Sequence, residues 1–202
     1  MINSGAVRKV FESSLKLRSG ESCLVVTDTL KKDIGEAFYN AALKITRKTK
    51  IIIIEPTAEH GAEPHDDVAR EMLNYDVELL ITDRSLTHTS ARKEATKRGA
   101  RIATMPSITE DMANRCLDVD YEEMRKRSEH LYGILNKAST VHMRTEAGTD
   151  IIFEVGNGKL VCGESSAENS GSFPVCFFEK TEIERRQGYV LQVLRKCYFR
   201  SR

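Results

Sequence analysis

Short apolar runs alternate with segments of helical periodicity along the first two thirds of the chain. The apolar runs end in polar residues and predict buried strands over residues 23–28, 50–55, 77–82 and 101–105. Between them, apolar residues recur at steps of three and four, which is typical of amphipathic helices. This periodicity predicts helices over residues 5–17, 31–47, 66–75, 89–98, 109–117 and 121–137. Strands that alternate with helices at this spacing predict βαβ units with right-handed crossovers.

The pattern changes near residue 139. Residues 140–144 and 150–155 alternate between polar and apolar side chains, as half-buried strands do. Gly156-Asn157-Gly158 predicts a tight turn, after which residues 159–162 return as another strand. The expected fold class is therefore α/β: a mostly parallel, doubly wound-like sheet with flanking helices, followed by a β-rich segment from about residue 139. That segment is either an antiparallel extension of the sheet or the start of a second domain.

This change divides the chain into three expected parts. Residues 1–138 form the α/β domain, and residues 139–173 form a β-hairpin segment that starts a second domain or links to it. Residues 174–202 form an atypical tail, which carries seven Lys or Arg against three Asp or Glu, five of the 13 aromatic residues and two of the five cysteines.

The composition narrows the class of protein. The chain has 202 residues, a formal net charge of +1 and 40% hydrophobic residues, which is ordinary for a globular protein. The near-neutral charge argues against a nucleic-acid partner. The longest aliphatic run, Ile51 to Ile54, is far short of the ~20 residues that cross a bilayer, and the N-terminus has no apolar signal segment. An odd number of cysteines without close pairs is typical of a reducing cytoplasm. We therefore expect a cytoplasmic protein without a membrane partner.

Three acidic residues follow successive predicted strands. Asp28, Glu55 and Asp83 stand where each strand ends, and open α/β sheets bind ligands outside these carboxyl ends. Three carboxylates at one edge could hold a cation, or they could cap the helices that follow. His88 comes just after the third strand and could act as an acid or base, or its segment could only begin a helix. The motifs of nucleotide-binding loops, zinc helices and serine-hydrolase elbows are missing from the sequence.

A second candidate site precedes the predicted strand at residues 150–155. Gly148 permits a tight backbone, and Thr149 and Asp150 follow it directly. Asp150 could orient a neighbouring group in a ligand site. The alternative interpretation is a plain turn that enters a strand.

Three stretches together resemble one family of enzymes. They are residues 15–28, residues 88–109 with His88-Thr89 and Met105-Pro106, and Gly148-Thr149-Asp150-Ile151. Their order and spacing, from about residue 5 to residue 173, resemble the aminopeptidase T or thermophilic leucyl aminopeptidase family of metal-dependent exopeptidases. The resemblance implies the N-terminal domain of a larger cytoplasmic homodimer that removes N-terminal amino acids from peptide substrates. It also implies divalent metal ions (zinc, cobalt or manganese) in the full-length enzyme.

The chain departs from that family after Phe173. The family's Asn-Leu-Pro-x-Gly-Glu motif, whose Glu binds metal, is missing, so no residue of this chain is assigned as a metal ligand. We therefore expect the chain alone to be inactive. The unusual tail at residues 174–202 suggests a frameshifted or truncated family member; the alternative is a divergent C-terminus with a helix over residues 181–198. The alternative function is a non-catalytic α/β binding or dimerisation module, with a ligand near Asp28, Asp83 and His88.

Overall fold

The computed structural model of the chain describes residues 2–154, 159–162 and 176–179. These residues fall into two units, which divide at residue 121. The first unit contains, in order, α1 (Ser4–Lys9), the π-helical turn η1 (Val10–Ser14), β1 (Cys23–Asp28), α2 (Lys32–Leu43), β2 (Thr49–Ile54), α3 (Asp66–Glu71), the 3-10 turn η2 (Met72–Asn74), β3 (Val77–Ile81), α4 (Ser90–Lys97), β4 (Arg101–Thr104) and α5 (Glu110–Cys116). From the boundary onward follow α6 (Tyr121–Leu135), β5 (Thr140–Arg144), β6 (Asp150–Glu154), β7 (Lys159–Cys162) and β8 (Cys176–Glu179).

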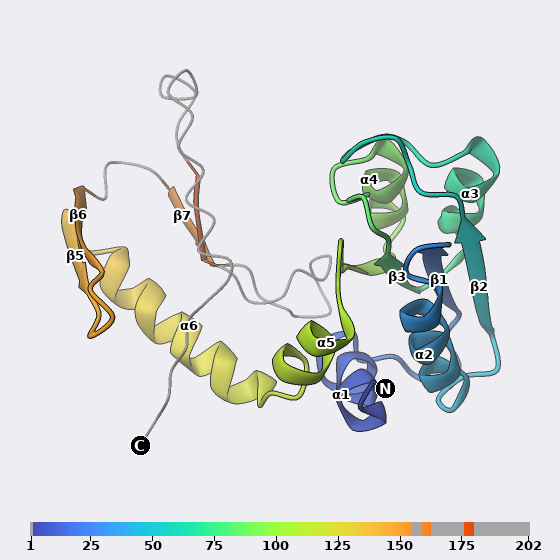
Figure 1. Cartoon of the computed structure of the whole chain (residues 1–202), viewed down its shortest axis with the longest axis horizontal. Helices are drawn as coiled ribbons and strands as arrows, with labels where there is room; N and C mark the ends of the chain where they lie inside the picture. Colours follow the sequence, from blue (N-terminus) through green and yellow to red (C-terminus); the bar gives the residue numbers. More distant parts are fainter. Residues whose placement is uncertain (1, 155–158, 163–175, 180–202) are drawn as a thin grey trace. The chain divides into compact units, whose positions relative to one another are not determined.

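The first unit is a three-layer α/β structure (Figure 1). Its four strands are all parallel and lie in the order β2-β1-β3-β4. Side chains of α1, α2 and α5 join one buried cluster on one face of the sheet, and those of α3 and α4 join another on the opposite face. The predicted doubly wound α/β fold with flanking helices is therefore confirmed.

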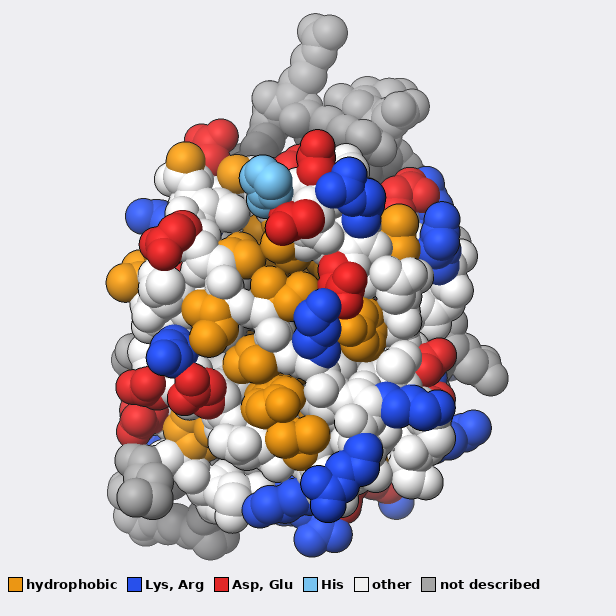
Figure 2. Space-filling view, turned by 90° about the vertical axis from the view of Figure 1, so that its right-hand side faces the viewer, with side chains coloured by type: hydrophobic (Ala, Val, Ile, Leu, Met, Phe, Trp, Pro, Cys, Tyr) orange, Lys and Arg blue, Asp and Glu red, His pale blue; other side chains and the backbone are white. Residues whose placement is uncertain are grey.

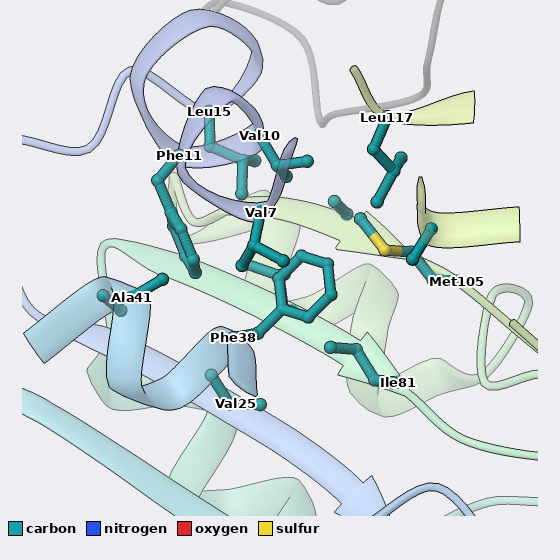
Figure 3. Packing of buried hydrophobic residues seen from close by; sticks show 14 of the residues in the cluster. Val7, Val10, Phe11, Leu15, Val25, Phe38, Ala41, Ile81, Met105 and Leu117 are labelled. Carbon is teal, nitrogen blue, oxygen red and sulfur yellow. The ribbon is translucent and has the colours of Figure 1, made fainter. Parts of the chain in front are cut away.

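The two apolar clusters meet at β1, whose six residues are all buried. Cys23 and Val25 point into the α1/α2 cluster, whereas Leu24 and Val26 point into the α3/α4 cluster. This alternation explains the continuous apolar run, because a strand buried on both faces has no polar side. In the α1/α2 cluster the rings of Phe11 and Phe38 meet edge to face, with centroids 6.1 Å apart (Figure 3).

Helix α2 lies unusually close to β1. A Cβ atom at Gly35 would stand 2.6 Å from Cβ of Thr27, so only glycine fits at this crossing. The close approach sets the first turn of α2 beside the carboxyl end of β1, where the candidate site lies.

Two predicted helices differ from the observed ones. The helix predicted over residues 5–17 changes from α to π geometry at Val10, where the Leu15 N–H bonds the Val10 carbonyl five residues back at 2.9 Å. Lys16 then takes a positive φ of 49° and ends the helix. The helix predicted over residues 31–47 ends at Leu43, because Thr46 turns away and its hydroxyl donates to the Glu21 carbonyl at 2.7 Å.

In the second unit, β5 and β6 form an antiparallel hairpin and β7 pairs with β8. The hairpin was expected instead between residues 150–155 and 159–162. Gly148, with φ of +96°, shapes the turn between β5 and β6, and the Thr145 N–H bonds the Thr149 carbonyl at 2.9 Å across it. The predicted turn at residues 156–158 and most of the tail to which the frameshift hypothesis applies lie outside the described residues. Within the described ranges, no helix is both long and apolar enough to span a bilayer.

A buried carboxyl group interrupts the α3/α4 cluster. Glu78 lies in β3 between Leu24 of β1 and Ile102 of β4, and its side chain has no exposed surface. Neither carboxyl oxygen has a hydrogen-bond partner among the described residues. Burial raises the pKa of Glu78 to about 8. The pKa of the neighbouring Cys23 thiol is raised to about 12, by its own burial and by the Glu78 carboxylate.

Glu78 makes the stability of the chain depend on pH. Between pH 4.5, the ordinary glutamate value, and about 8, the folded chain keeps a proton that the unfolded chain releases. The free energy of unfolding should therefore fall as the pH rises through this window, by at most about 1.4 kcal/mol per pH unit. Glu78→Leu should remove this slope and stabilise the chain at pH 8. Urea denaturation from pH 5 to 8 measures the pH dependence of the free energy of unfolding. Glu94→Leu, at an exposed position of α4, is the control. An unchanged slope in Glu78→Leu would contradict the assignment.

Candidate functional site

The candidate site lies where the chain reverses the order of its strands. From β1 the chain crosses through α2 to β2 on one side, and then through α3 to β3 on the other side of β1. The loops after β1 and β3 therefore leave the sheet in opposite directions, and the gap between them is the usual ligand position in open α/β sheets.

Asp28, the last residue of β1, joins these two loops. Its carboxylate is fully buried. Oδ1 accepts hydrogen bonds from the backbone N–H groups of Leu30 at 3.1 Å and Lys31 at 3.0 Å, and Oδ2 accepts one from the Asp83 N–H at 2.5 Å. Both oxygens are thus engaged with backbone donors, so Asp28 fixes the loops rather than facing a ligand.

Asp83 and Lys31 present charged groups at the opening between the loops. The Lys31 ammonium lies 3.5 Å from Oδ1 of Asp83, and both side chains are largely buried, with exposed fractions of 16% and 29%. The Arg84 guanidinium lies 3.7 Å from Oδ2 of Asp83. Ser107 completes the opening from the loop after β4, and its hydroxyl donates to the Asp83 carbonyl at 2.7 Å. Two cations, one carboxylate and one hydroxyl therefore converge at the strand ends.

The sequence reasoning missed Lys31 and Ser107. Each follows a predicted strand by two or three residues, the same signal that selected Asp28 and Asp83. Ser107 has a second feature that only the structure shows, a positive φ of 56°. A non-glycine residue in this conformation is uncommon and often marks a functional position.

His88 lies near α4, in a segment whose other side chains are well anchored. The Thr87 hydroxyl donates to Thr104 Oγ1 at 2.9 Å, and Thr89 caps α4 by accepting from the Arg92 N–H at 3.3 Å. The imidazole of His88 itself is exposed, and no hydrogen bond joins it to another described residue. The structure thus holds the backbone of His88 and leaves its ring available to a ligand.

Glu63 reinforces the start of α4. Its carboxylate accepts from the N–H groups of Ser90 at 2.6 Å and Ala91 at 3.2 Å. Burial opposes ionisation of Glu63, but these hydrogen bonds outweigh it and hold its pKa below the usual range. The loop that carries Glu63 is therefore fixed beside His88.

The remaining candidates, Gly148, Thr149 and Asp150, belong to the second unit. Asp150 lies across the β5–β6 hairpin from His142, with Oδ1 at 2.6 Å from Nε2, and its Oδ2 is 3.4 Å from Arg144 Nε. Asp150 therefore contacts both a histidine and an arginine of the neighbouring strand, and its role in a ligand site stays a prediction. The Thr149 N–H bonds the Thr145 hydroxyl at 3.1 Å and belongs to the turn.

The described residues do not fit a metal centre. Within these ranges, no three His, Cys, Asp or Glu side chains come together in a way that could hold a metal ion. Asp28 has its oxygens occupied, and Glu55, the third strand-end acid, accepts instead from the Thr29 hydroxyl at 3.4 Å.

The role of Asp28 leads to a stability prediction. Asp28→Asn replaces one acceptor oxygen by an NH2 group that faces backbone N–H donors, so we expect a loss of about 2–3 kcal/mol in the free energy of unfolding. Asp33→Asn, at an exposed position in the first turn of α2, should cost less than about 1 kcal/mol. Urea denaturation of both variants measures the difference, and equal losses would contradict a structural role for Asp28.

Comparison with known proteins identifies the family. A sequence model of the 2,5-dihydroxypyridine 5,6-dioxygenase family, NicX, matches residues 4–181. No match is found among curated proteins. The solved structure of a 2,5-dihydroxypyridine dioxygenase from Pseudomonas putida KT2440 is similar, with a TM-score of 0.60, 18% identity, and coverage of 88% of this chain and 56% of that chain. At this identity the likeness shows the fold alone.

The wild-type AmpT structure from Thermus thermophilus is a weaker match, with a TM-score of 0.43, 13% identity, and coverage of 79% of this chain and 56% of that chain. The resemblance to aminopeptidase T that the sequence suggested is thus supported only by a distant structural likeness, which carries no functional argument.

The prediction of a peptide-cleaving metallopeptidase is wrong, and so is the alternative of a non-catalytic module, because the family match is to an oxidative enzyme. The chain spans a little over half the length of the solved structures it matches. It belongs to the 2,5-dihydroxypyridine 5,6-dioxygenase family.

Proposed function

We propose that this chain takes part in the oxidative ring cleavage of a hydroxylated pyridine and that its first unit binds the ring. The observation that carries this proposal is the family match over residues 4–181. A dihydroxypyridine is a small, flat ring with two oxygen substituents and a ring nitrogen. It needs a cation or hydroxyl donor for an oxyanion, and an acceptor for an N–H or O–H group.

The strand-end opening supports this proposal because it offers both kinds of group. Lys31 supplies a donor and the Asp83 carboxylate supplies an acceptor. The Ser107 hydroxyl gives its hydrogen to the Asp83 carbonyl and keeps lone pairs that can accept a further hydrogen bond. Lys31 is largely buried, so a charged hydrogen bond to it is stronger than one at a free surface. His88, exposed on an anchored backbone, has ring nitrogens that can accept or donate a hydrogen bond to a ligand.

Dioxygen chemistry calls for a group that the described residues do not supply. Ring cleavage by a dioxygenase places both oxygen atoms of O2 in the product, and a redox-active cofactor provides the electron transfer that starts it. Zinc, expected from the aminopeptidase resemblance, has no redox chemistry, so a redox-active divalent ion such as iron is the better proposal. We assign the described first unit to substrate binding alone. The buried Cys23 and exposed Cys116, both free thiols, support a reducing, cytoplasmic setting.

Anaerobic binding of 2,5-dihydroxypyridine to the full chain tests this assignment apart from oxidation. Lys31→Gln removes the buried cation and should weaken binding by about tenfold, the effect of a hydrogen bond to a charged group. Lys32→Gln is the matched control, because the neighbouring Lys32 is exposed and pairs with Glu36 on the outside of α2. Isothermal titration calorimetry measures the Kd of the ring for both variants. Binding that is undetectable at millimolar ring concentration, or equal effects of the two variants, would contradict the proposal.

His88 is tested by its effect on the same equilibrium. His88→Ala should weaken binding of the ring several-fold, about what one lost hydrogen bond costs. Because the ring of His88 is exposed, the variant should keep the Tm of the parent chain. His130→Ala, at another exposed histidine in α6, serves as the control. Unchanged affinity in His88→Ala would remove this residue from the site.

A further inference from the structure

The strand β2 leaves one edge of the sheet open. It pairs with β1 on one side, and no described strand lies on the other. The carbonyls of Lys48 and Ile54 accept from Cys23 and Thr29 N–H groups at 2.9 and 3.0 Å, so the even-numbered residues direct their backbone groups toward β1. The N–H and C=O of one strand residue point the same way, and successive residues alternate. Thr49, Ile51 and Ile53 therefore present their backbone groups outward.

The side chains along this edge are apolar. The four isoleucines Ile51 to Ile54 are only partly buried, and Ile53 is 41% exposed. Leu30, 64% exposed, follows Thr29, whose N–H bonds the last residue of β2. Figure 2 shows the side of the molecule that carries β2, with hydrophobic side chains gathered in a band between charged groups. An open apolar edge is a surface that pairs with another strand.

The usual protection against edge pairing is weak here. Lysine on an edge strand commonly keeps other strands away. Lys50 is held instead by Glu71, with Nζ 2.6 Å from Oε1, and the Tyr75 hydroxyl also donates to that oxygen at 2.9 Å. Its ammonium is thus directed to α3 and neutralised. At the opposite edge β4 has only four residues and begins with Arg101, so it offers a poorer pairing strand.

We propose that β2 pairs antiparallel with β2 of a second copy of this chain, which joins the two sheets into one. The charge distribution selects this partner and direction. Arg47 and Lys48 lie just before β2, and Glu55 follows its end. Antiparallel pairing of two copies puts the basic start of each strand beside the acidic end of the other. Parallel pairing would place like charges together, which is destabilising.

The outward backbone groups also define the register. If Ile52 lies opposite Ile52 of the second copy, Ile51 pairs with Ile53 and Thr49 with Glu55 across the contact. This register engages every outward N–H and C=O of β2 between Thr49 and Ile53. It also places the Ile52 pair at a non-hydrogen-bonded position, where Cα atoms are about 4.5 Å apart.

A matched pair of charge variants tests the register. Thr49→Lys and Thr49→Glu both remove the bond from the Thr49 hydroxyl to the Thr46 carbonyl, so they differ only in the charge placed opposite Glu55. Sedimentation velocity of the full chain should show a monomer–dimer equilibrium. Relative to the parent, Thr49→Lys should lower the dimer Kd and Thr49→Glu should raise it, each by roughly fivefold because the pair occurs twice per dimer. A chain that stays monomeric at 200 µM, or the opposite order of the two variants, overturns the proposal.

Cysteine cross-linking tests the same contact independently. Ile52→Cys should form a disulfide-linked dimer on mild oxidation, since the two Cα atoms lie within disulfide range. Ile53→Cys, one position along, faces Ile51 of the second copy and should link no more than the parent chain with its native cysteines. Non-reducing electrophoresis measures the yield. A dimer that forms equally in both variants would show that the copies meet elsewhere.

Discussion

The buried carboxylate of Asp28 is the group on which the geometry of the strand-end opening depends. It collects three backbone N–H groups from the two loops that diverge at β1 and β3. Without that acceptor, the Leu30 and Asp83 N–H groups would lose this hydrogen bond, whereas the Lys31 N–H would keep the Asp28 carbonyl at 3.1 Å, and the loops would lose their common anchor. The positions of Lys31 and Asp83 follow from it, because each stands in a loop whose backbone Asp28 holds.

Glu78 shows why such a carboxylate works only at the end of a strand. In the middle of a parallel sheet the backbone N–H groups are used by neighbouring strands, so Glu78 in β3 finds no donor among the described residues. Beyond the strand ends the backbone turns, and its N–H groups become free to bind an anion. The same chemical group is therefore fully hydrogen-bonded and structural at one position and costly at the other. This contrast is the physical reason that polar sites in α/β proteins gather at the carboxyl ends of strands.

Much of this arrangement can be predicted from the sequence. The apolar runs and the helical periodicity locate each strand of the first unit to within a residue or two, because burial on both faces of the sheet leaves a clear pattern. The strand-end rule also selects Asp28 and Asp83. Periodicity cannot show that backbone N–H groups occupy both oxygens of Asp28 or that Lys31 pairs with Asp83. Nor can it show that Glu78 lacks a partner among the described residues. These features depend on atoms brought together from distant segments. The pairing of β5 with β6 was missed for a related reason: the Asn157-Gly158 signal is local, whereas strand pairing is not.

The motifs that suggested an aminopeptidase indicate the fold of the chain, and they do not identify its reaction. A buried strand that ends in aspartate, a helix capped by Thr89, and a glycine turn at Gly148 are requirements of backbone geometry that unrelated chemistries share. What distinguishes the opening is its charge balance, and this fits the proposed substrate. The Lys31 ammonium and the Asp83 carboxylate, 3.5 Å apart, carry opposite charges. A ring that carries an oxyanion and an N–H group can satisfy both partners at once, so binding would replace one buried pair by two rather than leave a charge alone.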